Sequence, residues 1–401
     1  ASDNSSNSDP IAYDKLSGFI GGDDGGDDTS SKSFLVVKLN TYGSIQWQKK
    51  IGNSHVGTGI TVDLFGNVYV TGYSTEMDGE CNIIKFNSVG NLIWQKTIGW
   101  TYGKSICVDK SGYIYVSGTT MVSLSLFDED DSELNYGVVK LDPDGTIIWM
   151  KILGGNGMDI NTSLTLDDLG NIYLNGYQNS EDTYNYGVIK LDNDGNIIWQ
   201  KNIGGDDEIK GMAIAVDDVG NVYLNGSQPS DSYGLNDYGV IKLDSNGDIV
   251  WQKKIVGTGN DYGEAIAVDS FGSIYLNGTH LASNKSVSAV IKLNNNGTLV
   301  WQKSIGFSNF GKAITVDSDD NVYAAGYTQN SNSSYFVVSK IYKTQETANL
   351  DLMIGNMNFS IKNLSFVSLN IPDFILPEAI QNSDLNVINS YMNIPNMNIG
   401  T

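Results

Sequence analysis

The sequence predicts an all-β protein, a seven-bladed β-propeller of four-stranded blades with a short C-terminal extension. Short apolar runs rich in β-branched and aromatic residues indicate strands, and the Asp-, Asn- and Gly-rich breaks between them indicate tight turns. Residues 186–226 show the unit best, with the runs VIKL, NIIWQ, AIAV and VYLN. The same text recurs along most of the chain with a period of about 50 residues, which is typical of propellers.

Two markers count the repeats. A lysine near the end of each third strand occurs at seven positions: Lys38, Lys85, Lys140, Lys190, Lys242, Lys292 and Lys340. A tryptophan follows nine residues later at six of them: Trp47, Trp94, Trp149, Trp199, Trp251 and Trp301. We interpret these tryptophans as structural residues that pack neighbouring blades together. After Lys340 the tryptophan is lost, but 348–355 keeps the shape of an outer strand with Leu350 in its place.

The repeats predict three segments. Residues 1–10 are polar and are interpreted as the ragged start of a chain whose signal peptide has been removed. Residues 11–355 are expected to form the propeller, which begins with a divergent copy of the repeat over 11–22. Residues 356–401 leave the repeat, alternate partly in the manner of a strand and are rich in Asn. We expect this extension to serve in docking or in self-assembly.

The loops predict where binding occurs. The turns inside each pair of strands are uniformly short, whereas the loops between pairs differ in length and share the opposite face, where binding residues usually lie. The longest insertion spans 119–137. Acidic residues of these loops, with one Phe, are the candidate binding residues: Asp23, Asp24, Asp27, Asp28, Phe127, Asp128, Glu129, Asp130, Asp131, Asp206, Asp207 and Glu208.

Composition limits the partners. The net charge is −22, and all 24 basic residues are lysine. Such a charge repels nucleic acid and anionic membranes, and the absence of arginine removes the usual bidentate clamp for phosphate or carboxylate. No apolar run reaches the length of about 18 residues that a membrane span requires. The two cysteines, Cys81 and Cys107, do not indicate a disulfide.

The repeat text resembles the bacterial and archaeal SBBP propeller repeat. Members of that family show D-x-x-G-N-x-Y-x-x-G before a K-L-D strand, and the chain has this text at Asp63–Gly72, Asp167–Gly176 and Asp217–Gly226. The resemblance covers 11–355 and implies a seven-bladed fold and a secreted or surface location, with no single activity. A weaker similarity is to quinoprotein-type propeller repeats, but the chain lacks their adjacent Cys pair and cofactor-binding Arg.

The sequence bears on three kinds of chemistry. The D-x-D-G turns, such as 142–145 and 192–195, suggest Ca²⁺ ligands, but sister turns substitute Asn or Val freely, so turn geometry explains them and no cofactor is assigned. Acid pairs in the loops suggest a polysaccharide hydrolase or lyase, which requires two carboxyls at a defined separation. His55 and His280 lie in different repeats without a nucleophile pattern, so no triad or zinc site is expected.

Together these observations predict a non-enzymatic extracellular, cell-surface or particle-surface propeller that binds a protein or glycan through its variable-loop face. Two alternatives remain open. One is a structural subunit of a surface layer, filament or virion assembled through 356–401. The other is a polysaccharide hydrolase or lyase that uses the acidic loop residues.

Overall fold

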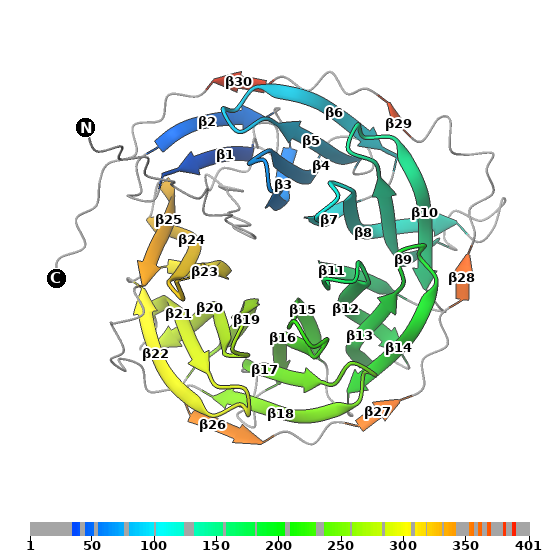
Figure 1. Ribbon diagram of the computed structural model, residues 1–401. Coiled ribbons are helices and arrows are strands. Elements are labelled where there is room, and N and C mark those ends of the chain that lie inside the picture. The colour runs from blue at the N-terminus through cyan, green and yellow to red at the C-terminus, as the bar shows by residue number, and fades with distance from the viewer. Residues whose placement is uncertain are drawn as a thin grey trace, which may run out of the picture.

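The computed structural model describes residues 34–341, apart from gaps at 41–44, 52–54, 76–79, 100–101, 124–131, 155–157, 181–182, 205–208, 230–235, 257–258, 283–284, 306–308, 318 and 331–332. It also describes residues 353–356, 360–362, 367–369, 380–381 and 387–389. These residues form sheets arranged in a ring around a central axis (Figure 1). Within them, no helix has the length and apolar character needed to cross a membrane.

Five blades have four propeller strands each, ordered from the axis outward (Figure 1). The first contains β3 (His55–Val62), β4 (Val68–Ser74), β5 (Cys81–Phe86) and β6 (Leu92–Ile98). The second contains β7 (Tyr102–Val108), β8 (Ile114–Ser123), β9 (Ser132–Leu141) and β10 (Ile147–Gly154). The third contains β11 (Asp159–Leu166), β12 (Ile172–Ser180), β13 (Thr183–Leu191) and β14 (Ile197–Gly204).

The ring continues with a fourth blade, β15 (Lys210–Val216), β16 (Val222–Pro229), β17 (Asn236–Leu243) and β18 (Ile249–Val256). The fifth contains β19 (Asp261–Val268), β20 (Ile274–Ala282), β21 (Lys285–Leu293) and β22 (Leu299–Ile305). The sixth has three described strands, β23 (Asn309–Val316), β24 (Val322–Asn330) and β25 (Ser333–Ile341). Within every blade, consecutive strands pair antiparallel.

The described blades that begin at an innermost strand therefore number six, one fewer than the seven predicted. An outer pair, β1 (Phe34–Leu39) and β2 (Ile45–Ile51), lies in the ring between the sixth and first blades (Figure 1). Val36 and Ile51 of this pair are buried in a cluster with Val68 and Ile84 of the first blade. The outer pair thus occupies the place of the remaining blade, and its expected inner half, 11–22, lies outside the described residues.

The apolar core lies between blades. In the joint of the third and fourth blades, Tyr186 and Ile203 pack in one cluster with Leu224 and Ile241. Because each sheet buries both faces against neighbours, the middle strands are buried along their length; in β5, for example, every residue is buried, including Asn82 and Lys85. An alternation of buried and exposed side chains, as expected for a sheet with one face in solvent, is confined to the outer strands, where Ile198 and Val250 are about half exposed.

The C-terminal segment runs backward around the rim. Its short strands, β26 (Met353–Asn356), β27 (Ser360–Lys362), β28 (Val367–Leu369), β29 (Ile380–Gln381) and β30 (Val387–Asn389), add to β18, β14, β10, β6 and β2 in turn (Figure 1). Each pairs antiparallel with the last residues of an outer strand. The expectation that 348–355 forms the outer strand of the last blade is wrong for its described end, since Met353 pairs with Val256 of β18.

Candidate functional site at the central cavity

The acidic loop residues singled out in the sequence lie outside the described residues. This holds for Asp23, Asp24, Asp27, Asp28, Phe127, Asp128, Glu129, Asp130, Asp131, Asp206, Asp207 and Glu208. Their role therefore stays a prediction. The candidate site consists of the innermost strands, which surround the axis, and of the joints that hold those strands in place.

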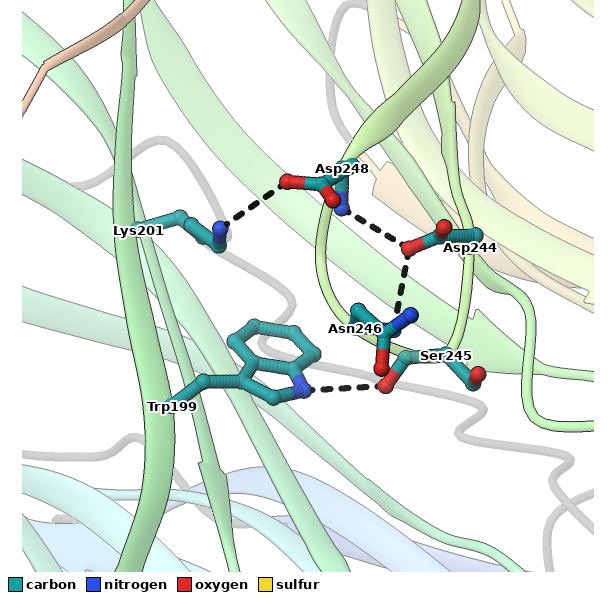
Figure 2. Close-up of polar contacts among 6 residues, drawn as sticks. All are labelled: Trp199, Lys201, Asp244, Ser245, Asn246 and Asp248. Atoms are coloured by element: carbon teal, nitrogen blue, oxygen red, sulfur yellow. Dashed lines mark hydrogen bonds and ion pairs between the residues drawn. The ribbon is translucent and has the colours of Figure 1, made fainter.

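The recurring tryptophans lie at the joints between neighbouring sheets. Trp199 in the third blade donates its indole N–H to the carbonyl of Ser245 in the fourth, at 3.0 Å (Figure 2). Trp47, Trp94, Trp149 and Trp251 make the equivalent bond at 3.0–3.2 Å. Beside this bond, Lys201 pairs with Asp248 at 3.2 Å (Figure 2). The tryptophan position is thus a joint contact with the next outer turn.

The D-x-D-G and related turns are shaped for this joint. One carboxyl oxygen of Asp244 accepts the backbone N–H groups of Asn246 and Asp248 at 2.9 Å each (Figure 2). Gly247 has φ +80, and a Cβ there would lie 3.1 Å from the Trp199 ring. The Asp therefore serves its own turn and the Gly makes room for the indole. In the described part of the chain, no three His, Cys, Asp or Glu side chains converge as a metal site would require.

A second network explains the D-x-x-G-N-x-Y text. The Tyr223 hydroxyl donates to Asp217 of the preceding turn at 2.9 Å, and the Lys242 ammonium lies 5.1 Å from the Tyr223 ring centre. Burial first, and then the Asp217 hydrogen bond and charge, raise the pKa of Tyr223, so its hydroxyl stays protonated as a donor. Five sister tyrosines repeat the bond at 3.0–3.2 Å: Tyr69, Tyr115, Tyr173, Tyr275 and Tyr323.

The innermost strands enclose a cavity of about 120 Å³ on the axis. Each of the six strands has one register shift against its neighbour, and the residue at the shift lines this cavity. Because a bulge turns one side chain away from the regular alternation, it can direct that side chain to the axis. We call these residues the bulge ring: Thr58, Lys104, Thr162, Met212, Glu264 and Lys312. Behind them the cavity is lined mainly by small and branched apolar residues such as Ala213 and Ile266.

Four members of the bulge ring take part in holding the blades together. The hydroxyl of Thr58 donates to the Gly103 carbonyl of the second blade at 2.6 Å, and that of Thr162 donates to the Gly211 carbonyl at 2.9 Å. Glu264 and Lys312 form an ion pair at 2.5 Å between the fifth and sixth blades. Lys104 and Met212 have no such bond to a neighbouring described blade.

Aromatic pairs lie at the variable-loop end of the blades. Tyr73 and Tyr102 meet edge to face with ring centres 4.9 Å apart, and Tyr177 meets Tyr184 in the same way at 5.4 Å. Phe310 stacks on Tyr327 at 4.8 Å. Tyr102 and Phe310 are the first and second residues of their strands, so these pairs face the loops and not the short turns.

The two histidines do not join this site. Nδ1 of His280 in β20 is hydrogen-bonded to a carboxyl oxygen of Asp261, its register partner on the preceding strand β19, and both side chains are buried in the fifth blade. His55 begins β3 in the first blade.

Sequence reasoning missed the bulge ring. If side chains alternate regularly along each innermost strand, the residue after the recurring Gly, as in Gly103-Lys104 and Gly211-Met212, has no special direction. The sequence analysis therefore assigned it no role. One signal was present: at this position the six copies carry four residue types, whereas the positions that follow are mostly small and then Ile or Leu.

Comparison with known proteins identifies the repeat. The family model described as "SBBP: Beta-propeller repeat" matches residues 46–79. Residues 46–79 thus match an SBBP propeller repeat. The matched residues run from β2 through β3 and β4, so they span one joint of the ring. The comparison with curated proteins found no match.

Among solved structures, an ulvan lyase of a new family of polysaccharide lyase, PL25, is 13% identical with a TM-score of 0.46, and the match covers 70% of this chain and 79% of the lyase chain. A protein of unknown function from Bacteroides caccae is 16% identical with a TM-score of 0.38, covering 56% and 77%. An apocarotenoid oxygenase from Synechocystis is 13% identical with a TM-score of 0.42, covering 75% and 74%. These similarities are too distant to bear on activity or ligand.

Proposed function

We propose that the protein is a non-enzymatic binding propeller of the cell exterior or of a surface, and that it takes a glycan or protein partner on its variable-loop face at the mouth of the central cavity. One observation carries the proposal. On a frame whose joints repeat almost unchanged, the residues of the bulge ring vary, and two of them, Lys104 and Met212, form no hydrogen bond or ion pair with the neighbouring described blades.

The surroundings of these two residues support binding. Ligand sites in proteins are concave, mostly apolar and furnished with a few placed polar groups, and aromatic rings provide contact area at low entropic cost. The cavity is lined by apolar residues together with Thr, Lys and Glu side chains, and three aromatic pairs lie at the variable-loop end of the blades. A location outside the cell accords with the resemblance to the SBBP repeat.

The test measures binding and turnover on the same samples. Purified protein is screened against an array of glycans and a panel of extracellular proteins, and each partner found is tested with a Lys104→Gln/Met212→Gln variant. We expect a partner whose affinity falls at least about tenfold in the variant, with no product formed. Chemical turnover of a glycan, or a partner that binds the variant equally well, would overturn the proposal.

A second candidate, a structural subunit of a surface layer, filament or virion, is favoured by the C-terminal strands. Strand addition to an exposed sheet edge is a common mode of protein association, and β26–β30 use this mode on the edges of their own chain. A strand from a neighbouring copy would satisfy the same edges. If this candidate holds, a chain ending at Gly355 remains a folded monomer by light scattering while the full chain assembles; assembly of the shortened chain would exclude it.

A further inference from the structure

Lys104 has an unusual position for a lysine of this chain. It is the bulge residue of β7, lines the central cavity and is only partly exposed. Its ammonium lies 5.4 Å from the centre of the Tyr73 ring and 5.7 Å from that of Tyr102. The two rings come from neighbouring blades, so the ammonium lies at a joint, beside the cavity wall.

The charge of Lys104 lacks a counter-ion within the described residues. The other lysine of the bulge ring, Lys312, is paired with Glu264 at 2.5 Å, whereas the Lys104 ammonium contacts two aromatic rings and forms no ion pair with a described residue. Burial lowers the pKa of Lys104, which is the response of an ammonium that has lost water without gaining an anion. A cation–π contact offsets part of this cost, and a bound anion would offset more.

The rings beside Lys104 indicate the kind of anion. Tyr73 and Tyr102 meet edge to face, and Tyr102 is 38% exposed, so ring surface is presented next to the ammonium. Aromatic faces provide rigid, amphipathic contact area of the kind that packs against the C–H face of a pyranose, and an ammonium provides a point charge for a carboxylate. Ser105 and Ser163 also line the cavity.

Resting on the proposed function, we infer that Lys104, with Tyr73 and Tyr102, forms a subsite for the carboxylate of a uronic acid unit in an acidic glycan. The net charge of −22 further limits the kind of acidic glycan that is expected to bind. The field of the whole molecule repels densely charged polymers, so the subsite suits a chain in which carboxylated units are separated by neutral sugars.

The experiment compares matched ligands and matched variants. Oligosaccharides that alternate a uronic acid with a neutral sugar are titrated into the full chain by calorimetry, alongside the same oligosaccharides with the carboxylates methyl-esterified. Lys104→Met removes the charge in the cavity, and Lys110→Met removes the charge of an exposed lysine that pairs with Asp168 at 2.9 Å. A peptide with a free or amidated C-terminus tests the other source of a carboxylate.

We expect the acid form to bind at least about tenfold more tightly than the ester, and Lys104→Met to abolish that difference while leaving ester affinity within about twofold. Lys110→Met should change neither. In the native chain, raising the pH through the lowered pKa of Lys104 should weaken binding of the acid but not of the ester. This measurement uses the native protein alone, so it does not depend on the folding of a variant.

Equal affinity for acid and ester, or acid binding that survives Lys104→Met, would overturn the inference while leaving the proposed function intact if neutral glycans or proteins still bind. Preference for the free peptide carboxylate over the uronic acid would overturn the saccharide assignment. Absence of any glycan or protein partner would remove the inference together with the proposed function.

Discussion

At the joint of the third and fourth blades, Trp199 donates to the Ser245 carbonyl, and four further joints repeat this bond within 0.2 Å. Around the central cavity, the six equivalent bulge positions carry Thr, Lys, Met and Glu. Both regions are made by the same repeat. The joints are constrained in common because each must hold a neighbour, whereas the bulge side chains face the axis and are free to differ.

The bulge ring is itself divided. Thr58 and Thr162 bond to the next blade, and Glu264 pairs with Lys312 across a joint, so these four still contribute to holding the ring together. Lys104 and Met212 do not. The difference between the two regions therefore predicts opposite behaviour: joint substitutions should lower stability, and substitutions at Lys104 or Met212 should affect binding.

The largest effect is expected for Trp199→Ala. It removes a half-buried indole, its hydrogen bond and its packing over the next turn, and should lower the free energy of unfolding by about 2 to 4 kcal/mol. Chemical denaturation measures it. The adjacent Ile198 is 51% exposed, and Ile198→Ala should stay within about 0.5 kcal/mol. Similar losses in both variants would contradict the role of the joint.

The next largest effect is expected for Gly247→Ala, which should lower the free energy of unfolding by about 1 to 3 kcal/mol. The residue has φ +80, and its new Cβ would lie 2.8 Å from the Lys201 side chain and 3.1 Å from the Trp199 ring. Thermal and chemical unfolding provide the measurement. Gly99 is the control, because a Cβ there meets nothing within 4 Å. A stable Gly247→Ala variant would show that the turn and the indole are not coupled.

Tyr223→Phe should cost about 1 kcal/mol, since it leaves the Asp217 carboxylate without one buried donor at 2.9 Å. Tyr102→Phe serves as the matched control, because the contacts of Tyr102 are made by its ring and not by its hydroxyl. The difference in unfolding free energy between the two variants is the readout, and equal costs would count against the Asp–Tyr network.

A smaller effect is expected on the stability of the protein at acidic pH. Burial of Asp317 acts to raise its pKa, but hydrogen bonds from Asn321, Tyr323 and the Asp319 amide outweigh it, so the pKa is lowered below its ordinary 3.8. A lowered pKa in the folded state gives stability that is present above pH 3.8 and lost as the pH falls through the folded value. The stability difference between native and Asp317→Asn proteins should therefore shrink below pH 3.8. A difference independent of pH would contradict this assignment.

Much of the propeller fold could be predicted from the sequence, because it depends on short local sequence motifs. Turn residues such as Asp217 and Gly247 and the spacing from Lys190 to Trp199 predicted four-stranded blades and the position of the joint contact. The pairing of β26–β30 was not predicted, because strands of two to four residues carry almost no pattern and their partners lie far away in sequence. Met353 was assigned to the wrong sheet for that reason.

The candidate site was less accessible. The direction of Lys104 and Met212 depends on a register shift between two strands, which residue patterns alone do not reveal. The approach of Tyr73 to Tyr102 depends on how neighbouring blades are placed around the ring. Sequence variation at the bulge position was visible, but its meaning required the geometry of the cavity.

The most direct test measures stability and binding together in two variants, Trp199→Ala at the joint and Lys104→Gln/Met212→Gln in the bulge ring. We predict that the joint variant loses about 2 to 4 kcal/mol of unfolding free energy and, while folded, binds its partner as the native chain does. The ring variant should stay within about 1 kcal/mol of native stability and lose binding at least about tenfold. A ring variant as unstable as the joint variant, or one that binds normally, would contradict the account.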